Sequence, residues 1–560
     1  MSDIQESLRE SSTALRDVFR NRNLRRLNLA FTGSVIGDWA YGVAASVYAY
    51  RQGGVTAVGL LEVVRFVSMA LLAPFAALLA DKFDRKRVLI SADAVRVVLV
   101  LAAALIIQLD GPALAVYALA IVTSIIGTAF RPALAALMPT LANHPSELAA
   151  ANVASSTIES IGFFVGPAIG GVLLSVTGIA TVYVFNAATF AWSALLVVGL
   201  TPVLASAAID DSEPDAPADA ESADERPSLF AGVGDGFRVI FANKDIRLLI
   251  GLCVAQTVVA GASVVFGVAI ALDLLDLGNG GVGLLDSALG VGGLLGGFVA
   301  LLLAQRGSLA RDFGLGIILW AAPLLLIAAW PTLPSVIIAM VIIGVANSVV
   351  DVNAYTILQR LVPDEVMGRV FGAMESAVVG GMALGALLMP ILISTVGLRS
   401  GLAVIGVGVS AIVVVGIPGL RRIDKVALAP AGLDLIRGVA ILSPLPDRVL
   451  ERLARRSTTI SVPSGQAVMR EGDAGDQFFI IETGTVDVTI RGGFVRLLTA
   501  GDSFGEIALL RDIPRTATVT ATSDLTMRTI AREEFLSAVT GDGESSNQAD
   551  LVVSRLLTIR

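Results

Sequence analysis

Cysteine and histidine are almost absent from this chain of 560 residues. Cys253 is the only cysteine, so a disulfide framework and a thiolate metal site are excluded. His144 is the only histidine, which excludes clusters of histidine metal ligands and histidine proton relays. The G-x-x-x-x-G-K-S/T loop that serves nucleotide hydrolysis is missing as well. We therefore expect no metal cofactor and no enzymatic activity.

Charged residues are also scarce. They make up 16% of the chain, against about 25% in a typical soluble domain. The deficit is confined to residues 27–200 and 246–418, whereas residues 203–243 and 419–560 have the composition of soluble protein. The formal net charge of −8 does not suggest nucleic acid as a partner. The first 23 residues are polar and contain no apolar run, so we expect no removable signal peptide.

Long apolar runs are abundant instead. A helix that spans a bilayer needs about 20 mostly apolar residues, and twelve such segments can be placed along the chain. They are expected near residues 27–50, 57–80, 87–109, 113–137, 152–176, 180–202, 246–271, 281–304, 313–331, 334–358, 369–394 and 398–418. The sequence thus predicts an α-helical protein whose first partner is the lipid bilayer.

Basic residues set the expected orientation and domain plan. Alternate loops and both flanks of the apolar region carry most of the Lys and Arg residues, while the opposite loops carry little beyond Arg51 and Arg399. Because basic loops stay on the cytoplasmic side, both termini of this multi-pass protein are expected in the cytoplasm, below the plasma or inner membrane. An acidic linker, too polar to form a core, divides the apolar segments into six and six. The expected parts are a cytoplasmic N-terminal segment (1–26), a six-helix bundle (27–202), the acidic linker (203–243), a second six-helix bundle (244–418), a short linker (419–435), a sensor domain (436–536) and a tail or lid helix (537–560).

A basic loop follows the second apolar segment and reads Ala77-Leu78-Leu79-Ala80-Asp81-Lys82-Phe83-Asp84-Arg85-Lys86-Arg87. It resembles motif A of the major facilitator superfamily, a gating loop between the second and third helices. The resemblance implies that Asp81 meets a helix N-terminus or an arginine, and that Arg85 and Lys86 anchor the cytoplasmic face. Ala77 and Asp84 replace two glycines of that motif, which puts close backbone approach in question. An ordinary basic loop is the alternative interpretation.

The fifth apolar segment carries regularly spaced glycines and one proline, namely Gly162, Gly166, Pro167, Gly170 and Gly171. Glycines four residues apart clear one face of a helix, so that a neighbouring helix can approach closely. Proline kinks a helix. The run resembles motif C of proton-coupled drug exporters of the same superfamily. The resemblance implies that superfamily's fold of two six-helix bundles and an exporting direction, although small-residue packing alone also explains the spacing.

Charges inside the apolar segments are candidates for transport and proton coupling, because charge is costly in a bilayer. Asp38 lies about 16 Å along its helix from Leu27, near the middle of a hydrocarbon core about 30 Å thick. It could carry a proton, or it could pair with a buried arginine for packing. Two further pairs, Glu62/Arg65 and Asp93/Arg96, have i,i+3 spacing, which predicts local neutralisation. Arg65 or Arg96 could also attract an anionic substrate.

The last soluble stretch alternates in a β manner. Apolar residues at every second position are separated by turn sequences such as Pro463-Ser464-Gly465 and Thr483-Gly484 between residues 458 and 530. Short strands with regular turns predict a β-roll or barrel, with flanking helices expected at 433–456 and from 532 onward. Breaks at Gly541-Asp542-Gly543 interrupt the expected last helix.

This stretch also contains the run Phe504-Gly505-Glu506-Ile507-Ala508 and, after it, Pro514-Arg515-Thr516. The runs resemble the phosphate-binding cassette of cyclic nucleotide-binding domains, as in catabolite activator protein and protein kinase regulatory subunits. The resemblance implies that Gly505 lets the backbone approach the ligand, that the N–H groups of residues 505–508 receive its phosphate, that Glu506 accepts from the ribose 2′-OH, and that Arg515 pairs with the phosphate. Thr516 stands where a hydroxyl can bond a syn purine, which permits cGMP without excluding cAMP. A domain that kept its fold and lost its ligand is the alternative.

Together these patterns predict twelve transmembrane helices in two six-helix bundles, followed by a C-terminal β-roll with flanking helices. The expected function is secondary transport, with proton-coupled export of an amphipathic small molecule regulated by cytoplasmic cAMP or cGMP. Two other functions remain open: a non-transporting sensor or transceptor for cyclic nucleotide, and a lipid or lysolipid flippase. A helix-turn-helix is not recognisable after the cassette, which disfavours a DNA-binding role.

Overall fold

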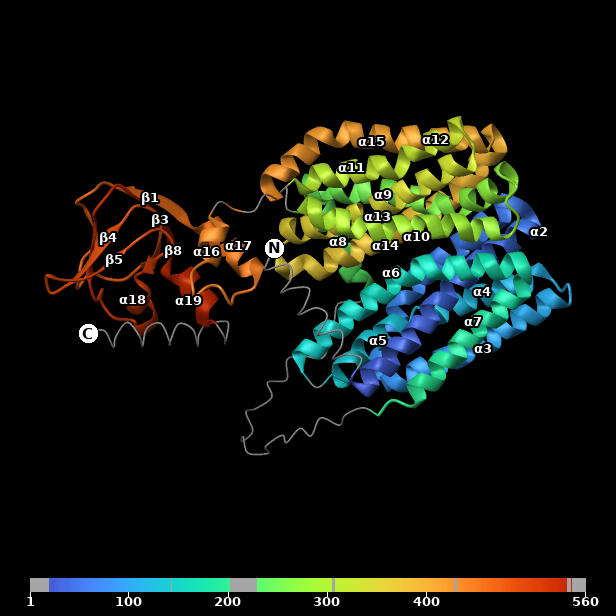
Figure 1. Ribbon diagram of the computed structural model, residues 1–560, viewed down its shortest axis with the longest axis horizontal. Helices are drawn as coiled ribbons and strands as arrows, with labels where there is room; N and C mark the ends of the chain where they lie inside the picture. Colours follow the sequence, from blue (N-terminus) through green and yellow to red (C-terminus); the bar gives the residue numbers. More distant parts are fainter. Residues whose placement is uncertain are drawn as a thin grey trace. The chain divides into compact units, whose positions relative to one another are not determined.

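The structure, a computed structural model, describes residues 20–142, 144–201, 229–304, 308–427, 430, 432–540 and 545. Its contacts divide the chain into two compact units, Met1–Ala427 and Leu428–Arg560. The first unit is helical, and the second is built around β-strands (Figure 1). We describe them separately as the helical unit and the sensor unit.

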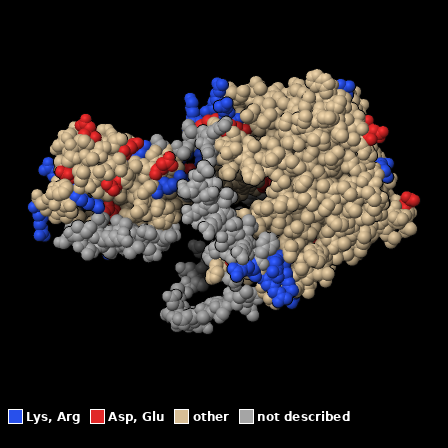
Figure 2. Space-filling model, viewed as in Figure 1, with Lys and Arg blue, Asp and Glu red and all other residues tan. Residues whose placement is uncertain are grey.

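The helical unit contains two sets of long apolar helices. Its N-terminal half consists of α2 (Arg22–Lys82), α3 (Arg85–Gln108), α4 (Ala113–Gly127), α5 (Phe130–Leu137), α6 (Pro145–Val176) and α7 (Ile179–Val198). Its C-terminal half consists of α8 (Leu229–Ala242), α9 (Lys244–Ala269), α10 (Gly280–Ala304), α11 (Leu309–Ala321), α12 (Pro323–Ala329), α13 (Leu333–Leu361), α14 (Asp364–Val396) and α15 (Leu398–Ala427). Most of the visible surface of the helical unit carries no charge, and more Lys and Arg side chains are visible at one end of the unit than at the other (Figure 2). This distribution fits the bias of basic residues toward one side of a membrane protein.

The helix α2 contains two of the predicted spans. Its 61 residues would extend about 92 Å as one straight helix, roughly three times the thickness of a bilayer core. The helix is broken at Gly53 and Gly54, where φ is −159° and 63°. Because a positive φ is strained for residues with a Cβ, glycine suits this break. It falls between the predicted spans 27–50 and 57–80. Eleven helices of the described residues, α2 counted once, are long and apolar enough to cross a membrane.

Several helix boundaries differ from the sequence-based expectation. Residues 229–242 were predicted to belong to the acidic linker, but they form the helix α8. The prediction missed this helix because the acidic residues that dominate the composition of the linker precede it. Gly236 of α8 packs so closely on α14 that a Cβ there would lie 2.1 Å from the Arg369 carbonyl oxygen. The expected span 113–137 is divided into α4 and α5, and the expected span 313–331 is divided into α11 and α12. The helix α15 continues to Ala427 instead of ending near 418. Residues 203–228 of the predicted linker lie outside the described residues.

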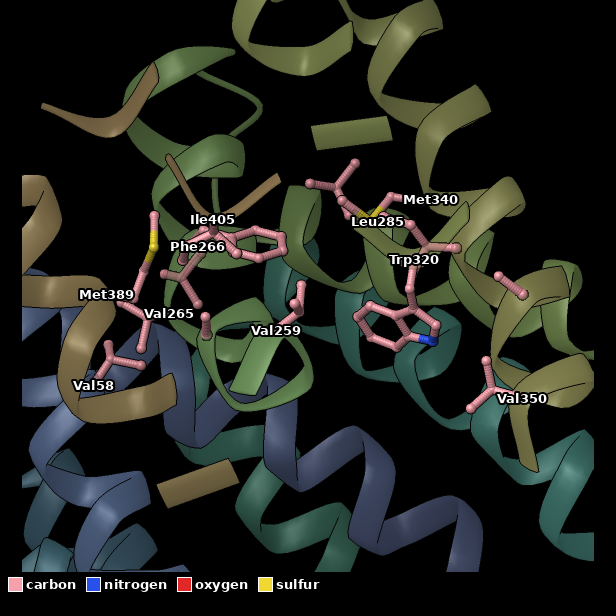
Figure 3. Packing of buried hydrophobic residues seen from close by; sticks show 14 of the residues in the cluster. Val58, Val259, Val265, Phe266, Leu285, Trp320, Met340, Val350, Met389 and Ile405 are labelled. Atoms are coloured by element: carbon pink, nitrogen blue, oxygen red, sulfur yellow. The ribbon is translucent and has the colours of Figure 1, made fainter. Parts of the chain in front are cut away.

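Both halves of the helical unit contribute to one apolar core. Val58 of α2 belongs to the same cluster as Phe266 of α9, Trp320 of α11 and Met389 of α14. Figure 3 shows these side chains between helices of both halves. This shared core holds the two halves together, because closely packed side chains gain many small van der Waals attractions that add up to a large stabilisation.

The sensor unit contains two four-stranded antiparallel sheets in the orders β1-β8-β3-β6 and β2-β7-β4-β5. The strands are β1 (Thr458–Val462), β2 (Ala467–Met469), β3 (Gln477–Thr483), β4 (Val486–Ile490), β5 (Gly493–Leu498), β6 (Ser503–Phe504), β7 (Thr518–Ala521) and β8 (Leu525–Ala531). One apolar core lies between the sheets, where Phe479 stacks on Phe504 at 5.0 Å. The predicted β-roll is confirmed.

Four helices accompany the β-roll: α16 (Leu433–Arg437), α17 (Asp447–Arg456), α18 (Glu506–Arg511) and α19 (Arg532–Thr540). They form a second core in which Phe478 of β3 stacks on Phe535 of α19 at 4.5 Å. The helix expected at 433–456 is thus divided into α16 and α17. The expected breaks at 541–543 lie outside the described residues.

Candidate functional sites

The loop between β6 and α18 has the geometry of an anion cradle. Gly505 precedes α18 with φ at 94°, in the left-handed region. A Cβ at this position would lie 2.7 Å from Nη1 of Arg515. The backbone conformation therefore favours glycine where the sequence places it, and a side chain at this position would displace the Arg515 guanidinium. Phe504 and Ala508 on either side are buried, while Ile507 is half-buried.

Arg515 lies in the same cradle, almost fully buried with 4% of its surface exposed. Its Nη1 donates to the Gly505 carbonyl oxygen at 3.0 Å and its Nη2 to the Gln477 carbonyl oxygen at 2.7 Å. Its Nη2 also lies 3.7 Å from a carboxylate oxygen of exposed Asp476. Burial lowers the pKa of the guanidinium from its usual value. The charge is thus held mainly by carbonyl dipoles, which an arriving phosphate could replace.

Glu506 opens α18 and is also buried, with 4% exposed. Its Oε2 has no hydrogen-bond partner among the described residues, and burial raises the pKa of its carboxyl group. A buried acceptor without a donor is costly. A ribose hydroxyl would supply that donor, so the residue fits the role that the resemblance implies. Thr516, half-buried, follows Arg515 directly.

A cavity of about 750 Å³ opens between the two halves of the helical unit. Residues of α2 to α6 line one wall, and residues of α10 and α13 line the other. Its charged lining residues are Asp38, Arg65, Arg96, Arg131, Glu159 and Asp351. The structure therefore brings together three of the five predicted intramembrane candidates, and Glu62 and Asp93 are paired to two of them.

The carboxylate of Asp38 is held by Arg96, 58 residues further along the chain. Arg96 Nη2 donates to both Asp38 oxygens, at 2.6 and 2.7 Å. Its guanidinium lies 3.7 Å from the centre of the Phe190 ring, and Nη1 is 3.6 Å from Asp93. Asp93 is fully buried, whereas the Asp38 side chain is 44% exposed. The alternative interpretation of Asp38, pairing with a buried arginine, describes the observed geometry, while its exposure keeps it accessible from the cavity.

The second predicted pair is local. Arg65 Nη1 contacts Glu62 Oε1 at 2.6 Å, and Arg65 Nε donates to the Ser124 hydroxyl at 3.1 Å. Arg131 forms an ion pair with Glu159 across the same wall. Each arginine of the cavity thus has a carboxylate partner inside the N-terminal half.

The opposite wall contains a polar chain that sequence reasoning left unassigned. Trp320 Nε1 donates to Asn347 Oδ1 at 3.2 Å, and Asn347 Nδ2 donates to Asp351 Oδ2 at 3.0 Å. Asp351 is exposed and lines the cavity. The i,i+4 spacing of Asn347 and Asp351 on one helix was a signal in the sequence that could have predicted their contact. The contact with Trp320 comes from another helix, and no sequence signal predicts it.

The glycines of α6 pack against two neighbouring helices. A Cβ at Gly162, Gly166 or Gly170 would meet α2 at 2.3, 2.4 and 2.8 Å respectively. A Cβ at Gly171 would meet the Gly280 carbonyl oxygen of α10 at 2.9 Å, and the Pro167 carbonyl oxygen faces Gly283 of that helix. The expected close helix approach is therefore present, and the structure identifies both neighbours.

The loop between α2 and α3 is anchored by residues around the motif A resemblance. The side chain of Asp81 lies outside the described residues. Asp84, one of the two departures from the motif, caps α3: its Oδ1 accepts from the Arg87 backbone N–H at 2.8 Å. Lys86 Nζ donates to the Leu200 carbonyl oxygen at 2.7 Å, which ties the loop to the end of α7, and Arg85 beside it is half-buried.

Comparison with known proteins agrees with this two-part architecture. The Major Facilitator Superfamily pattern matches residues 27–311 and 252–453, and the cyclic nucleotide-binding domain pattern matches residues 459–542. A crystal structure of the nucleoside transporter NupG has a TM-score of 0.58 at 13% identity, covering 72% of this chain and 100% of that one. At that identity the likeness shows the fold alone.

The sensor unit has closer relatives in sequence. The cAMP-dependent protein kinase regulatory subunit of Yarrowia lipolytica is 44% identical over 102 residues, and that of Eremothecium gossypii is 43% identical over 103. Each match covers 18% of this chain, and 27% and 22% of the relative. The chain thus spans about a quarter of the length of these curated relatives. With apolar helices long enough to cross a membrane many times, this chain belongs to the major facilitator superfamily and carries a C-terminal cyclic nucleotide-binding domain.

Proposed function

We propose that this protein exports an amphipathic small molecule in exchange for protons, and that cytoplasmic cAMP regulates the transport. The observation that carries the proposal is the bond between Asp38 and Arg96. An accessible carboxylate on the cavity wall is joined to an arginine that is 5% exposed in its side chain. Such a pair can exchange a proton with the cavity and pass the change to the buried helices.

The arrangement around Arg96 suggests how proton binding alters the unit. Protonation of Asp38 removes the negative charge that both bonds to Arg96 require. The guanidinium keeps a counter-ion, because Asp93 lies on its other side at 3.6 Å. Arg96 then moves its main contact from α2 to its own helix, α3. Proton binding thereby loosens α2 from α3, which is a differential interaction of the kind that shifts a conformational equilibrium.

Export and an amphipathic substrate are supported by the helix packing and the cavity lining. The segment from Gly162 to Gly171 resembles motif C, and this resemblance favours transport out of the cell. Trp39, 41% exposed, meets Phe163 edge-on at 4.5 Å on the cavity wall. An aromatic corner beside charged groups suits a substrate with both apolar and polar parts.

Regulation by cAMP is supported by the cradle of Arg515, Glu506 and Gly505. The relatives named cAMP-dependent protein kinase regulatory subunits favour cAMP over cGMP as the ligand, and Thr516 leaves cGMP as the second candidate. The basic flanks of the helical unit favour a cytoplasmic position for the sensor unit in the plasma or inner membrane.

Distance measurement between the two halves tests the proposal without a known substrate. Spin labels at exposed Thr157 of α6 and Ser376 of α14, each replaced by cysteine, report on the opening of the cavity. We expect the distance distribution of the full chain in lipid nanodiscs to depend on pH, and to change with saturating cAMP.

Asp38→Asn is the decisive variant, with Asp286→Asn of α10 as its control because Asp286 does not line the cavity. Asp38→Asn is expected to remove the pH response and keep the response to cAMP. A pH response that survives in Asp38→Asn contradicts proton coupling at this residue, and a distribution insensitive to cAMP contradicts regulation.

A further inference from the structure

Basic charge is concentrated where α8 ends and α9 begins. Arg238 of α8 is exposed, and so are Lys244 and Arg247 in the first turn of α9. The carboxylate of Asp245, between the latter two in sequence, accepts instead from Nε of Arg422 of α15 at 2.6 Å. In the part of the chain that the structure describes, Lys244 and Arg247 have no carboxylate partner. This corner of the helical unit therefore carries an excess of positive charge.

An exposed aromatic ring lies among these bases. Phe241, 63% exposed, is the third residue after Arg238 and the third before Lys244. Arg247 reaches back to the same residue, because its Nη1 donates to the Phe241 carbonyl oxygen at 2.6 Å. We name Arg238, Phe241, Lys244 and Arg247 the α8–α9 junction. It presents an apolar surface and a cationic surface next to each other.

The α8–α9 junction lies where two membrane-crossing helices end. The segments Lys244–Leu274 and Leu398–Lys425 are both long and apolar enough to span a bilayer. The bond between Asp245 and Arg422 places the start of the first beside the end of the second. Because a spanning helix leaves the hydrocarbon core at its ends, the junction lies at the level of the lipid headgroups. Aromatic and basic side chains are both favoured at that level.

The exposed ring indicates which anion fits the junction. Lys and Arg suit a soluble phosphate and a lipid phosphate equally well. A soluble anion would leave the ring of Phe241 in water, whereas a phospholipid places its phosphate on the bases and its acyl chain against the ring. A zwitterionic headgroup carries a cation that offsets its own phosphate. An anionic headgroup has no such cation, so it is the better counter-charge.

One carboxylate connects the junction to the helix α14. Asp235 of α8 accepts from Arg238 Nη1 at 3.4 Å, and its other oxygen lies 3.7 Å from Nη1 of Arg369 of α14. A phosphate bound at the junction attracts Arg238 and leaves Asp235 to Arg369. The helix α14 in turn touches the N-terminal half, where a Cβ at Gly59 of α2 would lie 2.5 Å from the Ala386 carbonyl oxygen. An anion at the junction can therefore act on the contact between the two halves.

We propose that the α8–α9 junction binds the headgroup of an anionic phospholipid, and that the bound lipid strengthens the tie between α8 and α14. The phosphate lies between Lys244 and Arg247, and the acyl chain lies along Phe241. The site is distinct from the cavity between the two halves, which none of the four junction residues lines. It requires neither proton coupling nor cAMP.

Lipid titration of the purified full chain in detergent, read by native mass spectrometry, tests the site. The probes are phosphatidylglycerol, which is anionic, and phosphatidylcholine, which is zwitterionic. We expect the wild-type protein to prefer phosphatidylglycerol. The double variant Lys244→Gln/Arg247→Gln should weaken binding of the first phosphatidylglycerol molecule by about tenfold and change phosphatidylcholine binding less than about twofold.

A matched control separates this site from general attraction between bases and anionic lipid. Arg22 and Arg87 are exposed bases at the first residue of α2 and near the start of α3. The control Arg22→Gln/Arg87→Gln removes the same amount of charge, and we expect it to leave the first phosphatidylglycerol affinity within about twofold of the wild type. Equal loss in both double variants, or no loss in Lys244→Gln/Arg247→Gln, would overturn the assignment.

Inorganic phosphate distinguishes a lipid site from a site for a soluble anion. It cannot contact Phe241 through an acyl chain, so we expect it not to displace phosphatidylglycerol at equal ionic strength. Displacement by phosphate would show that the junction takes a free anion and would contradict the lipid assignment.

The effect on α14 is tested with the spin labels at Thr157 and Ser376. Nanodiscs of phosphatidylcholine with phosphatidylglycerol should give a different distance distribution from nanodiscs of phosphatidylcholine alone. Asp235→Asn should keep phosphatidylglycerol binding and lose this difference, because its amide no longer forms an ion pair with Arg369. A wild-type distribution that does not respond to phosphatidylglycerol, or a response that survives in Asp235→Asn, would overturn the proposed tie.

Discussion

Two arginines of this protein, Arg96 in the helical unit and Arg515 in the sensor unit, are equally buried and differently neutralised. Each is 4% exposed. Arg96 is bonded to Asp38 and lies near Asp93, so its counter-charges are part of the protein. Arg515 is bonded to two backbone carbonyl oxygens, and Asp476 at 3.7 Å is 80% exposed in its side chain.

The difference teaches what each site can respond to. A buried charge is costly unless it is paired. Where the partners are internal carboxylates, a proton is the simplest signal that can change the pairing, since it converts one partner to a neutral acid. Where the partners are neutral carbonyl groups, an external anion binds more strongly than they do and displaces them. The same residue type thus fits a proton-linked site in the helical unit and a phosphate-binding site in the sensor unit.

The largest effect is expected from removal of Arg96. Arg96→Met leaves fully buried Asp93 without a counter-ion, and breaking a buried pair costs roughly 3 to 5 kcal/mol. Thermal unfolding of the purified full chain should show this as a lower melting temperature of the helical unit. The double variant with Asp93→Asn should recover most of the loss. Failure of the second substitution to restore stability would mean that Asp93 is not the counter-charge.

Removal of Arg515 should act on ligand binding instead. Arg515→Ala is expected to weaken cAMP binding by about 100-fold, since a charge-assisted bond to a phosphate contributes up to about 3 kcal/mol. The helical unit should unfold at an unchanged temperature. Calorimetric titration of the full chain with cAMP measures the affinity, and Arg452→Ala, at an exposed arginine of α17, is the matched control. Comparable affinity in both variants would refute the phosphate role of Arg515.

Glu506→Gln is expected to have a smaller effect, which raises the stability of the sensor unit at high pH and weakens its binding of cAMP. The pKa of Glu506 is raised by burial, so the folded unit binds its proton more tightly than the unfolded chain. Stability from this group is present at low pH and falls as the pH rises from the unfolded pKa, about 4.3, through the raised folded value. Glutamine removes that loss, so the variant should be the more stable protein at pH 8 and not at pH 4.

Nucleotide binding should move in the opposite direction in the same variant. Loss of the charged acceptor for the ribose hydroxyl is expected to weaken cAMP binding by about 10- to 100-fold. Hydrogen exchange of β3 and β8 in the full chain measures the stability, and calorimetry measures the affinity. A variant that is less stable at pH 8 would show that Glu506 gains more from its surroundings than burial costs it.

Local spacing predicted what depends on one helix or one loop. The i,i+3 positions of Glu62 and Arg65 predicted the pair at 2.6 Å, and the turn-separated strands predicted the β-roll. The same spacing rule predicted the contact of Arg96 with Asp93, which at 3.6 Å is the longer of the two contacts that Arg96 makes with carboxylates. The shorter bond joins Arg96 to Asp38 of another helix, and helix spacing does not specify which neighbour a side chain will reach.

Three further features were not predicted from the sequence. The acidic residues before Pro227 dominated the segment 203–243, so the helix α8 at its end was not predicted. Asp351 was left without a role because its support comes from Trp320, 31 positions earlier on a different helix. Asp84 was noted as a departure from a motif, and only the fold shows that its carboxylate caps α3.

The glycine contact between α6 and α10 has a mechanical consequence for the two halves. A Cβ at Gly283 would lie 2.4 Å from the Pro167 carbonyl oxygen and 2.7 Å from the Gly171 amide nitrogen, so the two helices touch through their main chains. No interdigitated side chains lie in this contact, so none has to change its rotamer when one helix moves along the other. Resistance to sliding or rocking at this point therefore comes from main-chain atoms alone, and a single methyl group added there would push the two helices apart.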